Sequence, residues 1–279
     1  THYPTVDSLG GALRFSQLVT DRYFTLGLDD EQKVWVAGGT GHSGLTTANH
    51  HNEFRPLTFP DGETWEGMVA IDVGNQHGCA LSAEGVMHCW GHNDYGVLGV
   101  GTTDAQTATF EPDGSSAFTS TIPVTPHLPE EAGAVMSIVT SVDHSCAVTG
   151  DAGHVYCWGR NHKGQVGTGE VDTGDTAPVL TPSLVMTGPD TPLAGVVSLV
   201  DNSRSSATCA LDASNTLYCW GDNAHGLVSA SGSIASAVPY ATQLTTGLEP
   251  IAQAVIGWGH MCVVAQANTL WDKLSCEDH

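Results

Sequence analysis

The sequence predicts an all-β protein made of five consecutive repeats in one domain. A stretch with two cysteines followed by Trp-Gly and an asparagine recurs at Cys79–Gly101, Cys146–Gly169 and Cys209–Leu227, and such a period fixes the architecture of a chain. Short β-branched runs bounded by Gly, Asn, Asp or Pro accompany each recurrence, which is typical of strands and turns. No stretch of the sequence shows a sustained helical period with caps.

Each repeat can be divided into four short strands. The first opens on a proline, the second is a β-branched run, the third contains the first cysteine, and the fourth is the aromatic strand before Trp-Gly. The opening prolines are Pro56, Pro123, Pro178 and Pro239. An insertion at Thr187–Pro192 lengthens one of the repeats.

The first and last repeats are imperfect. Unit one lacks cysteines, and we align Tyr23 with the histidine that precedes the first cysteine elsewhere. The last unit stops without a proline strand, whereas the chain has a spare one at Pro4. We therefore expect one domain, residues 1–279, closed into a ring without exposed sheet edges. Its units are 17–55, 56–122, 123–177, 178–238 and 239–279, and residues 1–16 complete the last.

The chain is strongly acidic. It has 279 residues with 30 Asp and Glu against 8 Lys and Arg, a formal net charge of −22. Such a surface repels phosphate backbones and anionic lipids, so we expect neither a nucleic-acid nor a membrane partner. No apolar run is long enough to span a bilayer. The charge itself is explained by solubility in a salty or extracellular fluid.

The eight cysteines form four successive pairs. Members of the first three pairs stand ten or eleven positions apart around a Gly or Asn, which suits facing strands of a hairpin, and no pair has the CxxC spacing of a metal site. We expect disulfides, and therefore an extracellular or periplasmic location. Reduced thiols packed in the core are the alternative. The pairs are Cys79/Cys89, Cys146/Cys157, Cys209/Cys219 and Cys262/Cys276.

The pattern CWGxNxxGxLGxG, with HxCAL upstream, resembles the regulator of chromosome condensation (RCC1) repeat. The resemblance covers nearly the whole chain. It implies a β-propeller of four-stranded blades; members usually have seven blades, and five repeats are counted here. It also implies binding functions, which in this family range from nucleotide exchange on a small GTPase to β-lactamase inhibition by secreted bacterial members. The shared motif residues are those of the scaffold, and no partner-contacting residue can be carried over.

Trp90, Trp158 and Trp220 recur directly after the second cysteine. A repeated tryptophan can stack on a sugar, but packing between blades explains the repetition better because aromatic side chains bury the largest area. The glycines after them permit the conformation of the turn. The asparagines two positions further on are expected to bond their own turn backbone.

His77, His144 and His260 each stand two positions before a cysteine. A ring could bring these equivalent positions around one axis and form a metal site. Unit four has Ala207 in this place, and packed blades would hold the imidazoles too far apart for direct coordination. We favour a hydrogen-bonded structural role.

The positions that vary between repeats are better candidates for recognition, because a scaffold needs identity and recognition needs difference. They follow Trp-Gly at one end of the ring, and two phenylalanines lie in the long loop Thr102–Thr121. The candidate binding residues are His42, His92, Asp94, Phe110, Phe118, Arg160, His162, Asp222 and His225.

The sequence contains no catalytic signature. A nucleophile elbow, a zinc-protease motif and a phosphate-binding loop are all absent. Asp-rich segments such as Asp172–Asp175 could hold Ca²⁺, without the spacing of an EF-hand loop, and we expect no cofactor. We expect a secreted, non-enzymatic propeller that binds a protein, alone or in a larger extracellular assembly. The alternatives are a glycan- or metal-binding propeller, and a hydrolase or lyase with its site at the central channel.

Overall fold

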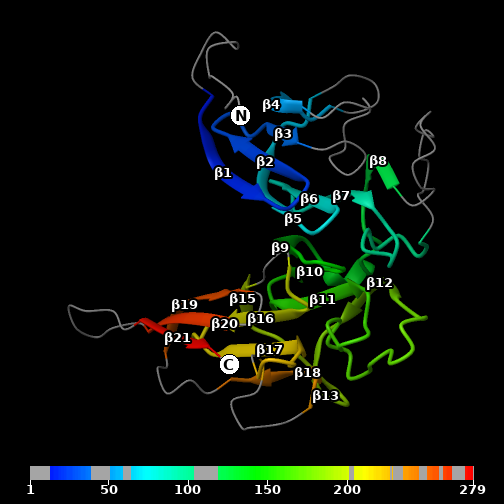
Figure 1. Ribbon diagram of the computed structural model, residues 1–279, viewed down its shortest axis with the longest axis vertical. Helices are drawn as coiled ribbons and strands as arrows, with labels where there is room; N and C mark the ends of the chain where they lie inside the picture. The colour runs from blue at the N-terminus through cyan, green and yellow to red at the C-terminus, as the bar shows by residue number, and fades with distance from the viewer. Residues whose placement is uncertain are drawn as a thin grey trace.

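Five antiparallel β-sheets form the framework of the protein. The computed structural model describes residues 13–38, 51–58, 64–103, 119–200, 204–226, 228, 235–244, 250–257, 260–265 and 274–278. Four sheets have four strands, and the last has three. The all-β propeller fold with five repeats is therefore confirmed. We number the sheets as blades 1 to 5 along the chain (Figure 1).

In every blade the strands follow one another in space as they do in the sequence. Blade 1 contains β1 (Phe15–Thr20), β2 (Phe24–Asp29), β3 (Val34–Gly38) and β4 (His51–Pro56). Blade 2 contains β5 (Met68–Val73), β6 (His77–Ser82), β7 (Met87–His92) and β8 (Thr119–Val124). Blade 3 contains β9 (Val135–Thr140), β10 (His144–Thr149), β11 (His154–Gly159) and β12 (Val179–Leu184). Blade 4 contains β15 (Val196–Val200), β16 (Ala207–Asp212), β17 (Leu217–Asp222) and β18 (Ala237–Gln243), and blade 5 contains β19 (Ile251–Ile256), β20 (His260–Ala265) and β21 (Leu274–Asp278).

The proline strand that opens each sequence unit is the last strand of the preceding blade. β4, β8, β12 and β18 each pair with the strand before Trp-Gly. The inserted residues form a hairpin of β13 (Met186–Gly188) and β14 (Thr191–Pro192). A single turn of 3₁₀-helix, Glu130–Ala132, precedes blade 3. Among the described residues, no helix is long and apolar enough to span a membrane.

The predicted cysteine pairing is confirmed for three blades. Disulfides join the second and third strands of blades 2, 3 and 4, with the two Cα atoms 4.1 Å apart in each. Cys262 is also disulfide-bonded, and it lies opposite Cys276 in the register of β20 and β21. The disulfide bonds are Cys79–Cys89, Cys146–Cys157 and Cys209–Cys219.

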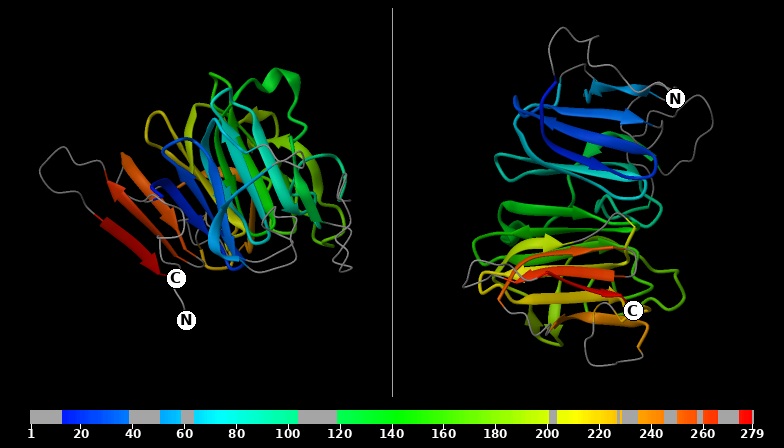
Figure 2. Two further views of the ribbon diagram at one scale, coloured as in Figure 1. Left: turned by 90° about the horizontal axis from the view of Figure 1, so that it is seen from above. Right: turned by 60° about the vertical axis from the view of Figure 1, so that its left-hand side comes forward.

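Neighbouring blades pack face to face (Figure 2), and a repeated polar contact crosses the interfaces between blades 2 and 3 and between blades 3 and 4. His77 of blade 2 and Ser145 of blade 3 are joined by a hydrogen bond of 2.9 Å. His144 of blade 3 makes the same contact with Thr208 of blade 4, at 2.6 Å. Both histidines are buried, so the histidine of the HxC motif latches one blade onto the next.

The repeated tryptophans also span these interfaces, as the packing interpretation predicts. Trp158 donates to the carbonyl of Val97 in the preceding blade at 2.7 Å, and Trp220 donates to that of Gln165 at 2.9 Å. Trp90 packs edge-on against Trp65, with ring centroids 5.2 Å apart. All four indoles are fully buried.

The alignment of Tyr23 with the HxC histidine is wrong by one residue. Phe24 pairs with Gly38 in the same register in which His77 pairs with Gly91. Gly38 has a φ of 121° and Gly91 a φ of 99°, so both glycines mark the same left-handed turn. Phe24 therefore occupies the histidine position of blade 1.

The five blades follow an arc, with blades 1 and 5 at its ends (Figure 1). Leu18 of β1 is 58% exposed, whereas the equivalent Ile71 and Ile138 of the inner blades are 1% and 7% exposed. The described residues thus leave the outer face of blade 1 uncovered. Residues 1–12, which belong to the strand expected to complete the last blade, lie outside the described part of the chain, so ring closure stays a prediction.

We expect the histidine latch to be measurable in stability. Replacing His144 with Ala should lower the free energy of unfolding by about 2 kcal/mol, because Thr208 is left buried without this partner. His260→Ala is the matched control: His260 begins β20 at the equivalent position but is exposed, so its loss should change stability by less than about 0.5 kcal/mol. Urea unfolding followed by tryptophan fluorescence measures both. Equal losses would contradict the latch.

Acid should destabilise the protein through the same side chains. Burial lowers the pKa of His77 and of His144 to about 3, from an ordinary 6.5. The unfolded chain therefore binds protons at pH values where the folded chain does not, and this stability is present above pH 6.5 and lost as the pH falls toward 3. Asp72, whose pKa burial raises to about 6, acts in the opposite direction, but one carboxyl does not offset two imidazoles. Urea unfolding at pH 7.5, 6 and 5 should show a progressive loss, which His144→Gln reduces; a stability that stays flat would contradict the assignment.

Candidate functional site

The loops that follow Trp-Gly and the turns between the first two strands of each blade lie at one end of the propeller, because the strands are antiparallel and sequential. We call the described loops of blades 2, 3 and 4 at this end the loop surface; it comprises residues 93–103, 141–143, 160–178 and 222–226. It contains most of the varying positions that the sequence singled out for recognition.

The motif asparagine makes these loops rigid. In blade 3, Asn161 donates to the carbonyl of Glu170 at 3.0 Å and accepts from the amide of Val166 at 3.1 Å. Asn93 and Asn223 make the same two kinds of contact in blades 2 and 4. The predicted bonding of the turn backbone is therefore confirmed, and the left-handed positions fall on glycines such as Gly164 and Gly167 instead.

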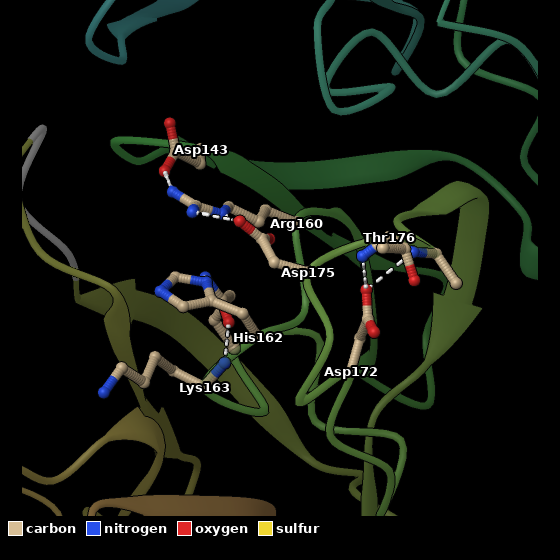
Figure 3. A network of polar contacts seen from close by, with 9 residues as sticks. Asp143, Arg160, His162, Lys163, Asp172, Asp175 and Thr176 are labelled. Atoms are coloured by element: carbon tan, nitrogen blue, oxygen red, sulfur yellow. Dashed lines mark hydrogen bonds and ion pairs between the residues drawn. The ribbon is translucent and has the colours of Figure 1, made fainter.

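Arg160 is the centre of the loop surface (Figure 3). Its Nη1 donates to Asp143 Oδ2 at 2.7 Å, and its Nε donates to Asp175 Oδ1 at 2.7 Å. Its Nη2 also pairs with Asp175, so Asp175 is held by a two-pronged contact. The guanidinium lies 4.6 Å above the ring of Tyr95, which belongs to the loop of blade 2.

The ion pair between Arg160 and Asp175 stabilises both the ionised form of Asp175 and the backbone conformation of that residue. The hydrogen bond from Arg160 holds the pKa of Asp175 below its ordinary value, and the same bond raises the pKa of Arg160. Asp175 has a φ of 53°, a left-handed conformation that costs free energy unless contacts hold it. Nearby, Asp172 accepts from the amides of Thr176 and Ala177 at 2.7 and 2.6 Å. The segment Glu170–Ala177 is thus ordered by Arg160 and Asp172.

A second set of contacts carries the surface into blade 4. Gln165 binds His162 Nδ1 at 3.3 Å and accepts from the backbone amide of Lys163 at 2.8 Å. Lys163 Nζ lies 3.9 Å from Asp222 Oδ1 of blade 4. Partial burial lowers the pKa of His162, and the charge of Arg160 adds to that effect.

The structure brings several of the predicted binding residues together. Arg160, His162 and Asp222 belong to the loop surface, and His92 pairs with its neighbour Asp94 at 3.0 Å. Burial lowers the pKa of His92 against the opposing effect of Asp94. His225 lies in the blade 4 loop and is half-buried. His42, Phe110 and Phe118 lie outside the described residues.

Sequence reasoning missed Tyr95 and Asp143 of this surface, and it considered Asp175 only as a Ca²⁺ ligand. Tyr95 stands between motif residues, and Asp143 directly precedes the latch histidine of blade 3. Their partner Arg160 was singled out, but these contacts join residues of different loops or blades. The rarity of cations offered one signal, since each of only 8 Lys and Arg in so acidic a chain must lie near carboxylates.

The three histidines proposed as metal ligands have different environments. His77 and His144 are buried in the interfaces between blades, and His260 is exposed. Within the described residues, no three His, Cys, Asp or Glu side chains are placed to hold a metal ion. Asp172 and Asp175, considered for Ca²⁺, are engaged by backbone amides and by Arg160.

A cavity of about 540 Å³ lies between the innermost strands of all five blades. Apolar residues outnumber polar ones in its lining, but polar atoms provide the larger part of the lining surface, and the polar residues include Gln17, Thr20, Ser137 and Thr140. Asp72 is its only charged lining residue in the described part of the chain. This is the place where an enzyme of this architecture would hold a substrate, but a single carboxyl group does not make a catalytic pair.

Two models of the regulator of chromosome condensation repeat match the sequence. One matches residues 68–97, 137–165 and 205–227, and the other matches residues 152–199. Blades 2, 3 and 4 therefore contain RCC1 repeats over these residues. The matched segments contain the HxC, CWG and asparagine positions described above, which are the scaffold of blades 2, 3 and 4.

Curated proteins with similar RCC1 repeats are longer than this chain. The ultraviolet-B receptor UVR8 of Arabidopsis thaliana is 26% identical over 240 residues, 85% of this chain and 47% of the receptor. The human E3 ubiquitin-protein ligase HERC2 is 29% identical over 182 residues, 64% of this chain and 3% of the ligase. The chain thus spans about half of the first relative and a small part of the second.

Solved structures support the propeller fold. Human WBSCR16 superposes with a TM-score of 0.71 at 23% identity, covering 92% of this chain and 61% of that one. Prp20p of Saccharomyces cerevisiae superposes with a TM-score of 0.68 at 20% identity, covering 91% and 56%. At this level of identity the likeness shows the fold alone.

Removing the guanidinium should loosen the segment Glu170–Ala177. In Arg160→Gln, Asp175 loses its partner and its left-handed backbone is no longer held, so we expect amide hydrogen exchange in this segment to accelerate at least about tenfold. Mass spectrometry of the peptide that covers it measures the change. Lys163→Gln is the control, because Lys163 contacts Asp222 and not this segment. Unchanged exchange in Arg160→Gln would show that Arg160 does not order the loop.

Proposed function

We propose that the chain is a non-enzymatic binding propeller that recognises a protein partner through the loop surface. The observation that carries the proposal is the Arg160 network, which joins the loops of blades 2 and 3 into one ordered surface built from positions that differ between repeats. Rigid, varied side chains on an invariant scaffold are what specific recognition requires, because little ordering entropy is lost on binding.

The relatives support a binding function without naming the partner. UVR8 is named as a receptor and HERC2 as a ligase, and the Prp20p structure was described together with its binding to Gsp1p and histones. Those activities belong to those proteins. For this chain, they support a propeller that acts by binding, and its partner remains to be identified by capture.

We further propose that the protein works in an oxidising compartment, outside the cell or in the periplasm, alone or in a larger assembly. Disulfides in three successive blades support this location, since such bonds persist where thiols are not kept reduced. The charge of −22 supports solubility in such a fluid and disfavours anionic partners.

The proposal predicts that an immobilised chain captures a protein from its native fluid, and that the loop surface is needed for this. The double variant Tyr95→Ala, His162→Ala should lose the captured protein, because both side chains lie beside Arg160 on the loop surface; its thermal unfolding is measured alongside, since Tyr95 also packs against the apolar cluster between blades 2 and 3. Glu130→Ala, Glu131→Ala is the control, since the turn between blades 2 and 3 lies at the opposite end. Capture that survives the loop variant, or the absence of any captured protein, would overturn the proposal.

A further inference from the structure

The cavity on the propeller axis has one residue that departs from the repeat. On the innermost strands, the residue opposite the first-cysteine position is Val19, Val139, Val200 or Val255 in blades 1, 3, 4 and 5. In blade 2 it is Asp72, opposite Cys79. All five residues line the cavity. At this position around the cavity, four blades thus have a valine and blade 2 has a carboxyl group.

Asp72 is held in place by the next blade. Its Oδ2 accepts a hydrogen bond of 2.6 Å from the backbone amide of Thr140 in β9. No Lys or Arg lines the cavity in the described part of the chain, and Asp72 forms no ion pair there. Arg160 and Lys163 contact carboxylates of the loop surface.

The electrostatic state of Asp72 follows from this environment. Burial raises its pKa to about 6, and the amide of Thr140 only partly opposes that effect. Above pH 6 the side chain is therefore a carboxylate at the level of four valine side chains. Such a charge is poorly solvated, and a cation brought next to it removes the imbalance.

We propose that this cavity binds a small organic cation, an amine or ammonium ion with an apolar body. The ammonium group lies against Asp72, and the apolar body lies against the valines of the same level. A volume of about 540 Å³ is in the range of small-molecule sites, which usually combine apolar side chains with a small number of placed polar groups. The chain's charge of −22 raises the local concentration of cations.

Other ligand classes fit the cavity less well. An anion would meet the carboxylate of Asp72 in a weakly polar environment. A neutral apolar molecule would cover that carboxylate without pairing it. A bare metal ion needs several ligands, and the described residues provide no group of three carboxylates, imidazoles or thiols.

The test compares n-hexylamine with its neutral counterpart n-hexanol, using the full chain and isothermal titration calorimetry at pH 7.5. We expect n-hexylamine to bind at least about tenfold more tightly than n-hexanol, since only the amine pairs with the carboxylate. Its affinity should fall when the pH is lowered to 5, where Asp72 takes up a proton. Equal affinity for the two probes would overturn the proposal.

Variants locate the site. Asp72→Val restores the residue found in the four other blades, and it should fold while losing at least about tenfold in affinity for n-hexylamine. Asp72→Asn, which keeps an acceptor for the amide of Thr140, should lose the same affinity and separates the charge from the packing. Glu84→Gln removes an exposed carboxylate of blade 2 and should bind like the wild type. Equal loss in Glu84→Gln, or full binding by Asp72→Asn, would show adventitious attraction to the acidic surface and overturn the proposal.

Discussion

Each inner sheet of this protein, in blades 2, 3 and 4, is covered by its two neighbouring sheets, and this constraint governs the rest of the structure. The described chain has no long helix that could cover a sheet. Because alternate residues of a strand point to opposite faces, the second strand of each blade must satisfy two neighbours at once. In blade 3, His144 is hydrogen-bonded to Thr208 of blade 4, and the adjacent Ser145 is hydrogen-bonded to His77 of blade 2. Each such repeat therefore contributes residues to two interfaces, one with the blade before it and one with the blade after it. The stability of the protein is then approximately a sum of contacts between neighbouring blades.

Much of this arrangement could be predicted from the sequence, because residues that recur at one position of the repeat make the same kind of contact in each blade. The cysteine spacing, the buried tryptophans and the bonding of Asn161 all follow from recurrence. The alignment failed in blade 1, where no cysteine marks the register and Tyr23 was chosen over Phe24; a slip of one residue moves a side chain to the other face. The Arg160 network could not be foreseen, because Tyr95 and Asp143 reach it from different loops. Their meeting depends on how blades stack, which local patterns do not encode.

The scaffold explains why the variable residues gather at one end. The strand order of each blade places the Trp-Gly loop beside the turn between its first two strands, so a residue such as Arg160 lies within reach of Asp143. The motif asparagine then closes the loop on itself without using its exposed positions. The side chains between motif residues are therefore free to differ from blade to blade without disturbing the packing below them. The proposed recognition residues are therefore separate from the residues that hold the fold of the same repeat.

The segment between β9 and β10 connects the cavity on the propeller axis with the loop surface. Its Thr140 donates to Asp72 at the cavity, and three residues later Asp143 holds Arg160 on the loop surface. Between them, Ser141 donates to the carbonyl of Ser205 in blade 4, so this turn is constrained from three directions. A carboxylate at the apolar level of the cavity opposes folding above pH 6, since burial favours its protonated form. A valine, as in the four other blades, would avoid that cost but would remove the acceptor that Asp72 provides for the amide of Thr140. The cation proposed for the cavity would offset this cost by pairing with the carboxylate of Asp72. The bond to Thr140 places that carboxylate one turn away from the loop surface, which a protein partner would contact.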